Sequence, residues 1–310
     1  MNPHRLRAYL LLLIVSVIWG VAGPVIKFTL GGFDPLVFLT YRFAISAVVS
    51  LATILVIGFR LPKDKKIIKL ALFYGFLTST VALGLLFFGF DETTAIDATL
   101  ISATGPLFIS AGGLFFLKER VTLREKAGMG IAFVGTAITI AEPVLRGGNG
   151  FAGLGGNLLV FASILVGVAT AIFAKILLRN ELAELAPVMA TNLSFWVGFL
   201  TLAPIAAVVH SPLGIIEQIK AAPLVFHFGV LFMAILSGNL AYTLWHKAQK
   251  TIEVGEVSVF GYLYPLFATP LAVVWLKEKI SVPFLIGAAI IAAGVVIAEY
   301  KKSRYNKASK

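Results

Sequence analysis

The stretch from Pro106 to Gly135 reads PLFISAGGLFFLKERVTLREKAGMGIAFVG, and the chain repeats it in altered form from Pro265 to Gly294 as PLFATPLAVVWLKEKISVPFLIGAAIIAAG. The displacement is 159 residues (265 − 106) from the first position to the last, so the two copies align without a gap. Identical residues such as Leu-Lys-Glu hold the register, and conservative exchanges such as Arg-Val-Thr against Lys-Ile-Ser fill the rest. This internal duplication predicts two structurally related halves.

The composition indicates that lipid is the solvent of this chain. Hydrophobic residues make up 59% of its 310 residues, charged residues only 13%, and the mean hydropathy is +0.94. A water-soluble domain would be far more polar. Apolar runs long enough to cross roughly 30 Å of hydrocarbon as helices recur along the whole chain. About ten such spans are expected, at 8–28, 36–58, 68–90, 96–117, 126–142, 152–175, 187–209, 223–245, 257–276 and 282–299.

The basic residues are distributed unevenly between the loops. With the N-terminus placed in the cytoplasm, twenty lysines and arginines fall on the inside, and only Arg146, Lys220, Lys277 and Lys279 fall on the outside. This is the positive-inside pattern, so we expect a multi-pass protein of the cell membrane with both termini cytoplasmic. The net charge of +11 then faces the headgroups of the lipid bilayer, and it gives no reason to expect nucleic acid as a partner.

Five spans fall in each half, and an odd number makes the second half enter the membrane from the side opposite to the first. We therefore expect an all-α polytopic membrane protein with about ten transmembrane helices in two inverted five-helix repeats. The predicted boundaries are 1–145 for the first repeat, 146–156 for a Gly-rich linker, 157–300 for the second repeat and 301–310 for a basic cytoplasmic tail. A monomer is sufficient for this arrangement, and the sequence leaves the oligomeric state open.

Enzyme motifs are missing from the sequence. It contains no Walker loop, no nucleophile elbow, no His-Glu-x-x-His and no pair of carboxylates within one apolar run. Cysteine is absent, which excludes thiolate metal sites and a cysteine nucleophile. We expect no catalytic residue, no metal and no cofactor, and we do not expect an enzyme. A duplicated apolar chain is typical of secondary transporters, which bind a small-molecule substrate between their halves.

Two cations occupy costly positions near the first turn between spans. Lys27 lies near the end of the first span, and Arg42 lies about two turns into the second, beside Tyr41. A charge at that depth faces protein or water, which makes all three residues candidates for substrate binding. The structural alternatives are that Lys27 reaches the headgroups and that Arg42 pairs with Asp34 or a backbone carbonyl.

Other polar and aromatic side chains within spans recur at helical spacing and so share a helix face. Facing inward, such groups line a wet cavity or hydrogen-bond neighbouring helices, and the sequence does not separate these two roles. For His246 the alternative is a place at the membrane boundary. The further candidates for substrate binding are Trp19, Thr99, Ser102, Asn192, Trp196, Asn239, Tyr242, His246, Ser258 and Tyr262.

Helix breakers mark the places where spans could bend. Gly20 and Pro24 weaken the first span in its middle, and Pro106 and Pro265 interrupt the fourth and ninth spans at equivalent points of the two repeats. Paired breakers in corresponding positions indicate the binding region or the hinges that alternate access to it. These four residues are the predicted hinges.

The combination of these features resembles the EamA-type domain of the drug/metabolite transporter superfamily. The first copy is carried by Trp19-Gly20, Lys27, Pro35, Arg42-Phe43 and the motif at Pro106 to Gly135, and the second by Ala241-Tyr242 and the motif at Pro265 to Gly294. The second copy departs from the pattern where Ser194 stands near the position of the arginine. The resemblance implies ten helices in two inverted repeats, and export or exchange of small metabolites, often amino acids, without ATP.

The sequence indicates one function and leaves alternatives in other functional classes open. We expect a secondary transporter that exports or exchanges small metabolites by alternating access between the repeats. Lys27 and Arg42 favour a carboxylate-bearing solute, and the many aromatic residues favour one with an apolar portion, which together fit amino acids or related compounds. The alternatives are a membrane channel or sensor, and a membrane-embedded enzyme without a recognisable motif.

Overall fold

The computed structural model describes residues 3–57, 64–116, 122–145, 151–178, 187–249 and 259–299, together with residues 251 and 257. Within these ranges all regular secondary structure is helical. Eight segments are long and apolar enough to span a membrane, and two shorter apolar helices, Val259–Trp275 and Val282–Ala298, follow them. These ten segments coincide with the ten predicted spans, which confirms the all-α polytopic fold.

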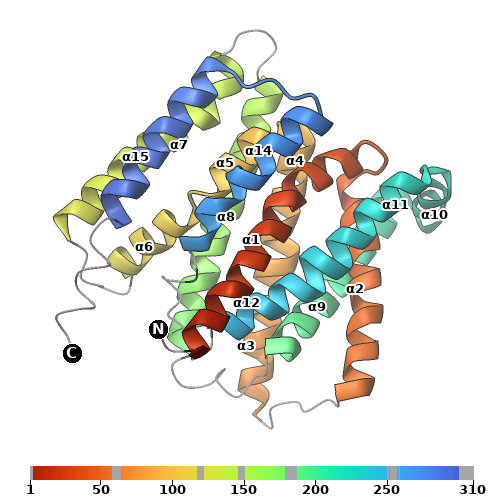
Figure 1. The fold of residues 1–310 in the computed structure, drawn as a ribbon. Coiled ribbons are helices and arrows are strands. Elements are labelled where there is room, and N and C mark those ends of the chain that lie inside the picture. Colours follow the sequence, from red (N-terminus) through yellow and green to blue (C-terminus); the bar gives the residue numbers. More distant parts are fainter. Residues whose placement is uncertain are drawn as a thin grey trace.

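The first repeat crosses the bundle five times (Figure 1). Its third crossing contains a π-helical segment, η1, and its fourth is interrupted between two α-helices. The elements are α1 (Pro3–Leu30), α2 (Pro35–Ile57), α3 (Lys65–Gly75), η1 (Phe76–Ala82), α4 (Leu83–Glu92), α5 (Ala95–Ser102), α6 (Gly105–Phe116) and α7 (Leu123–Leu145).

The second repeat follows the same plan. Its third crossing again contains a π-helical segment, η3, and its fourth begins with the 3-10 helix η4. The short helix α10 is an addition with no buried residue. The elements are α8 (Phe151–Leu178), α9 (Pro187–His210), α10 (Pro212–Ala221), α11 (Leu224–Leu231), η3 (Phe232–Leu240), α12 (Ala241–Gln249), η4 (Val259–Leu263), α14 (Tyr264–Trp275) and α15 (Val282–Glu299).

The last helices of the two repeats, α7 and α15, lie side by side at one edge of the molecule (Figure 1). A Cβ atom at Gly128 would lie 2.6 Å from the Gly294 carbonyl oxygen, and one at Gly135 would lie 2.9 Å from the Gly287 carbonyl oxygen. Residue numbers therefore rise along one helix where they fall along the other, so the helices are antiparallel. The glycines that define the sequence repeat are also the residues that bring its two copies into backbone contact.

The predicted Gly-rich linker is too long by about half. Residues 146–150 lie outside the described ranges, but α8 already begins at Phe151, so residues 151–156 belong to the first turns of a helix. Gly156 lies against α4, where an added Cβ would come within 2.8 Å of the Gly89 carbonyl oxygen. The glycines at this point therefore permit close helix packing instead of forming a tether.

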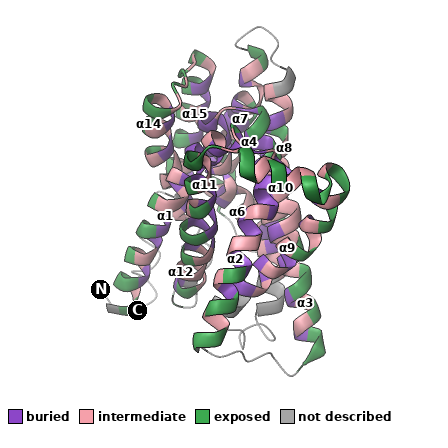
Figure 2. Cartoon of the chain, turned by 90° about the vertical axis from the view of Figure 1, so that its right-hand side faces the viewer, coloured by how far each residue is buried: buried purple, intermediate pink, exposed green. Residues whose placement is uncertain are grey.

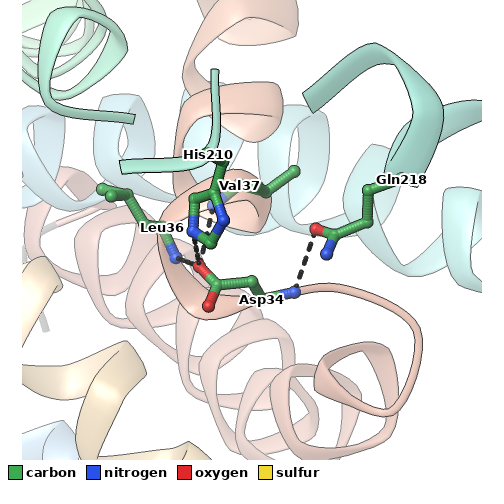
Figure 3. A network of polar contacts seen from close by, with 5 residues as sticks. All are labelled: Asp34, Leu36, Val37, His210 and Gln218. Atoms are coloured by element: carbon green, nitrogen blue, oxygen red, sulfur yellow. Dashed lines mark hydrogen bonds and ion pairs between the residues drawn. The ribbon is translucent and has the colours of Figure 1, made fainter. Parts of the chain in front are cut away.

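The two repeats are also joined at the end of the bundle that carries the turn between α1 and α2, here called the Asp34 end. The Asp34 carboxylate caps α2 by accepting hydrogen bonds from the Leu36 and Val37 amides. The same oxygen lies 3.0 Å from His210 Nε2 at the end of α9, and the Gln218 side chain on α10 accepts from the Asp34 amide (Figure 3). One short turn thus combines a helix cap with a contact between the repeats.

Exposed and buried side chains divide the molecule into an interior and a lipid-facing surface. Buried residues gather where helices face one another, and exposed residues lie on the outward faces (Figure 2). Many of the exposed side chains are large and apolar, for example Phe115, Val208 and Leu224. A surface of this kind is stable in hydrocarbon and aggregates in water, which agrees with the composition of the chain.

Candidate functional site

A cavity of about 340 Å³ lies among helices of both repeats. The first repeat supplies walls from α1, α2, η1, α4 and α5, and the second supplies α8, η3, α12 and α14. Its wall is mostly apolar and aromatic with a few hydroxyl groups and one charge, which is the usual character of a small-molecule site. The lining residues are Trp19, Ala22, Gly23, Ile26, Arg42, Thr78, Ala82, Leu83, Leu86, Phe87, Phe90, Thr99, Ser102, Ser163, Ile164, Gly167, Thr170, Met233, Ser237, Tyr242 and Tyr264.

Arg42 provides the charge in this wall, and its side chain is only 1% exposed. Its Nε donates a hydrogen bond of 3.0 Å to the Met233 carbonyl, and its guanidinium carbon lies 5.4 Å and 5.3 Å from the ring centroids of Phe43 and Phe87. The terminal nitrogen Nη1 has no hydrogen-bond partner although it is buried. The predicted carbonyl contact is therefore present, but it leaves one donor of the guanidinium free.

The π-helical segment η3 explains how Arg42 and its neighbours are held. A π-helical turn breaks the regular α-helical ladder and leaves carbonyl groups available to side chains. The Met233 carbonyl accepts from Arg42, and the Ser237 carbonyl accepts from Trp19 Nε1 at 3.0 Å. η3 thus fixes two cavity residues that belong to the other repeat.

Trp19 is also the centre of an aromatic cluster at the cavity. Its ring centroid lies 5.0 Å from that of Tyr242, 5.1 Å from that of Trp245 and 6.1 Å from that of Tyr264. The rings are tilted or edge-on to one another, which is a favourable geometry for aromatic pairs. Trp19, Tyr242 and Tyr264 form an aromatic wall of the cavity that Arg42 also lines, and Trp245 packs behind Trp19 outside the lining.

Hydroxyl groups supply the remaining polarity of the cavity. Thr78, Ser102 and Thr170 each donate to a carbonyl three or four residues earlier in their own helix. Their hydroxyl hydrogens are therefore used within the helix, and only the lone pairs of these oxygens remain for a further hydrogen bond. Thr99 Oγ1 is buried without a partner, beside the backbone of Gly23.

Five of the predicted binding residues thus line one cavity: Trp19, Arg42, Thr99, Ser102 and Tyr242. Several other polar residues of the wall were not among the predicted candidates, and two of them had a usable signal in the sequence. Tyr264 directly precedes the helix breaker Pro265, and Thr78 begins a Thr-Ser-Thr run inside an otherwise apolar span. Ser163, Thr170 and Ser237 stand singly in apolar runs and gave no such signal.

Lys27 is not part of the cavity wall. Its Nζ donates hydrogen bonds of 3.0 Å and 2.8 Å to the carbonyls of Phe90 and Asp91 in the last turn of α4. The final carbonyls of a helix lack partners within the helix and carry partial negative charge, so a lysine stabilises them. Lys27 therefore binds a helix end, and the prediction that it faces substrate does not fit its position.

Tyr41, His246 and Asn239 are occupied by contacts with other helices. Tyr41 bonds to His227 at 3.2 Å, and His246 bonds to Thr191 at 3.0 Å. Asn239 donates to the Ala234 carbonyl at 3.1 Å within its own segment η3, and its side-chain oxygen accepts from Ser50 of α2 at 3.4 Å. These groups satisfy one another across helix interfaces and do not line the cavity, as the alternative interpretation of such residues expects.

Three further predicted binding residues are absent from the cavity wall: Asn192, Trp196 and Tyr262. Asn192 is buried and Trp196 is half-buried on α9, and Tyr262 packs against the small cluster of Leu107 and Ala132. Ser258 lies outside the described residues. Asn192 and Trp196 lie one turn apart on α9, but neither lines the cavity.

The predicted hinges divide into two kinds. Pro106 follows the interruption between α5 and α6, and Pro265 follows the 3-10 helix η4 at the start of α14, so both mark irregular helix as expected. α1 in contrast runs unbroken past Gly20 and Pro24. An added Cβ at Gly20 would lie 3.0 Å from the Tyr264 carbonyl oxygen, so this glycine permits α1 to approach α14 closely.

Acidic residues contribute at the Asp34 end of the bundle. Asp97 and Glu142 are each 3% exposed and lie near each other. Glu278 of the second repeat accepts from the amides of Ala95 and Ile96 at 2.7 Å and 3.0 Å, which caps the first turn of α5. The Leu-Lys-Glu motif of the second copy therefore has a structural role between the repeats.

The fold defines a polytopic membrane protein with a cavity between two inverted repeats. The chain belongs to the EamA-like transporter family, whose sequence model matches residues 6–141 and 154–300. The two matched segments correspond to the two repeats. The resemblance drawn from the sequence motifs is thereby confirmed.

Relatives of known sequence match nearly the whole chain. It is 25% identical over 297 residues to "Uncharacterized transporter YyaM" of Bacillus subtilis (strain 168), with 95% of this chain and 94% of the relative covered. It is also 25% identical over 292 residues to the "Probable terminal-alkyne amino-acid exporter" of Streptantibioticus cattleyicolor, with 94% and 93% covered. A solved crystal structure shares the fold with a TM-score of 0.61 at 18% identity, covering 97% of this chain and 99% of the other.

Proposed function

We propose that the protein is a secondary transporter that exports or exchanges small carboxylate-bearing metabolites, amino acids or related compounds, without ATP. It works by alternating access, in which the two repeats rock about the cavity and open it to one side of the membrane at a time. A monomer suffices, because one chain supplies both repeats. The orientation follows the charge pattern, with both termini cytoplasmic and the Asp34 end facing outward in the cell membrane.

The observation that carries this proposal is the free donor of Arg42. A guanidinium buried in apolar surroundings is costly unless an anion balances it, and its planar fork matches a carboxylate. Nη1 has no partner and Arg42 lines the cavity, so a carboxylate bound there would complete its hydrogen bonds. The aromatic wall around Trp19 would receive the apolar part of the solute. The Streptantibioticus relative, whose name includes amino-acid export, supports the same substrate class.

The alternatives in other functional classes have less support. The described cavity wall contains no pair of acids and no nucleophile with an adjacent base, as an enzyme would need. A channel needs a continuous path for its solute, whereas here η3, Trp19 and Arg42 tie the two repeats together across the cavity. A carrier that exposes the cavity to one side at a time uses such contacts as its closing surfaces.

The test is transport by the purified protein in proteoliposomes. Vesicles loaded with one unlabelled carboxylate should take up the same labelled carboxylate in exchange, with a rate that saturates. Arg42→Lys should keep part of this rate because the charge remains while the fork is lost, and Arg42→Gln should lose most of it. Flux that does not saturate would mean a channel, and full exchange by a folded Arg42→Gln variant would remove Arg42 from the site.

A further inference from the structure

The charge of the cavity is unbalanced. Among the lining residues that the structure describes, Arg42 is the only one with a formal charge, and none is acidic. Asp34, the acid closest to Arg42 in the sequence, is engaged by His210 and by the first amides of α2. The cavity with Arg42 alone therefore carries a net charge of +1.

Two unsatisfied groups indicate where an anion would lie. Arg42 Nη1 and Thr99 Oγ1 are both buried polar atoms without partners, and both residues line the cavity. Buried polar groups are nearly always hydrogen-bonded in folded proteins, so unsatisfied ones in a cavity wall require an explanation. A carboxylate accepts hydrogen bonds from a guanidinium and from a hydroxyl, so it is the chemical group that these two unpaired donors lack.

The balance of charge distinguishes between kinds of carboxylate. A monoanion brings the total charge of the occupied cavity to zero. A zwitterionic amino acid brings one positive and one negative charge, so the total stays at +1, and its ammonium is buried in the cavity with the guanidinium. Water screens such an excess charge outside the protein, but the low-dielectric wall of this cavity does not.

From this we infer that the cavity selects a monoanionic carboxylate with an apolar or aromatic body over the zwitterionic amino acid of the same skeleton. The inference rests on the proposed function, because among the carboxylate-bearing compounds proposed for this site it favours those without an ammonium group over the amino acids themselves. The hydroxyls of Thr78, Ser102 and Thr170 offer lone pairs to an ammonium, but a neutral acceptor balances no charge. The expected preference is about tenfold to hundredfold in affinity, the range of a charged group left without its counterion.

A matched series of three compounds isolates the effect of each charge. 3-Phenylpropanoate carries only the carboxylate, phenylalanine adds the ammonium at the neighbouring carbon, and 2-phenylethylamine carries only the ammonium. All three present the same ring to the aromatic wall of Trp19, Tyr242 and Tyr264. Affinities would be measured by calorimetric titration of the purified full chain in nanodiscs at pH 7. 3-Phenylpropanoate is expected to bind at least about tenfold more tightly than phenylalanine, and 2-phenylethylamine not at all.

Two variants test the electrostatic cause. Ser163→Asp adds a carboxylate to the cavity wall on α8, while Arg42 lies in the same wall on α2. The added negative charge balances the guanidinium, so the preference should shift toward the zwitterion phenylalanine. Ser163→Asn is the matched neutral control and should leave the preference for 3-phenylpropanoate unchanged. Thermal unfolding of both variants shows whether they remain folded. A Ser163→Asp variant that is folded and still prefers 3-phenylpropanoate to the same degree would contradict the electrostatic explanation.

The outcomes separate this inference from the proposed function. Equal or tighter binding of phenylalanine would overturn the preference for monoanions and leave a carboxylate carrier intact. Binding of 2-phenylethylamine with rejection of both carboxylates would overturn the inference and the proposed function together. Loss of 3-phenylpropanoate binding in a folded Arg42→Gln variant would support both.

Discussion

A methyl group added at Gly128 should force α7 and α15 apart. The Cβ atom of an alanine there would lie 2.6 Å from the Ala298 amide nitrogen and 2.6 Å from the Gly294 carbonyl oxygen. Both are backbone atoms of the facing helix, so no side chain can rotate to make room. Relief requires the helices to separate, which also weakens the contact between Gly135 and Gly287 further along the same interface. Overpacking of this kind costs about 1–3 kcal/mol.

Gly130 provides the matched control, because it lies on the same helix and an added Cβ there meets no atom within 4 Å. Alanine is a better helix former than glycine by about 0.8–1.0 kcal/mol, a gain that both substitutions share. The difference between Gly128→Ala and Gly130→Ala therefore reports the interface alone. It would be measured as the free energy of unfolding by denaturant titration in mixed detergent micelles, with Gly128→Ala the less stable by about 1–3 kcal/mol.

Combining Gly128→Ala with Gly294→Ala provides a second test of the same interface. Gly294→Ala places its methyl group 2.7 Å from the Gly128 carbonyl oxygen, so it opens the same gap from the other side. Once one alanine has separated the helices, the second should cost less than it does alone, because neighbouring substitutions are not additive. Equal stability of Gly128→Ala and Gly130→Ala would refute the claim that these glycines hold the repeats in backbone contact.

Three further predictions concern orientation and the contacts between repeats. Because the chain has no native cysteine, single-cysteine variants can be labelled selectively with an impermeant maleimide. Lys63→Cys should label only from the cytoplasm, and Asp91→Cys only from outside. The reverse pattern would mean that the topology is inverted. Glu278→Ala should lower the free energy of unfolding by about 1–2 kcal/mol, and Glu278→Gln by less, because the amide oxygen still caps α5; equal losses would mean that the cap is unimportant. Asp34→Ala should lower the free energy of unfolding by about 1–2 kcal/mol, because Asp34 caps α2 in addition to contacting His210. His210→Ala should lower it by less than about 1 kcal/mol, because the partly exposed contact between these two side chains adds little. A larger loss for His210→Ala would contradict this order.

The sequence by itself was sufficient for the architecture. Apolar runs of membrane-spanning length fixed the number of helices, since a helix is the structure that satisfies the backbone of a single segment in lipid. The duplication around Pro106 and Pro265, with five spans in each half, predicted the inverted arrangement that α7 and α15 display. These properties are periodic and local, so they are readable without knowledge of contacts. The boundary at 146–156 was harder, because glycine permits both flexible loops and close helix packing.

Only the tertiary structure decided which polar residues share the cavity. Spacing along a helix assigns residues to one face but does not show what that face meets, so Tyr242 and His246 looked equivalent although only Tyr242 lines the cavity. Lys27 and Arg42 likewise looked similar in sequence, yet one caps α4 and the other keeps a free donor in the cavity. Their partners are carbonyls of α4 and η3, at positions distant in the chain. Backbone carbonyls are present at every residue, and only packing determines which of them a cation reaches.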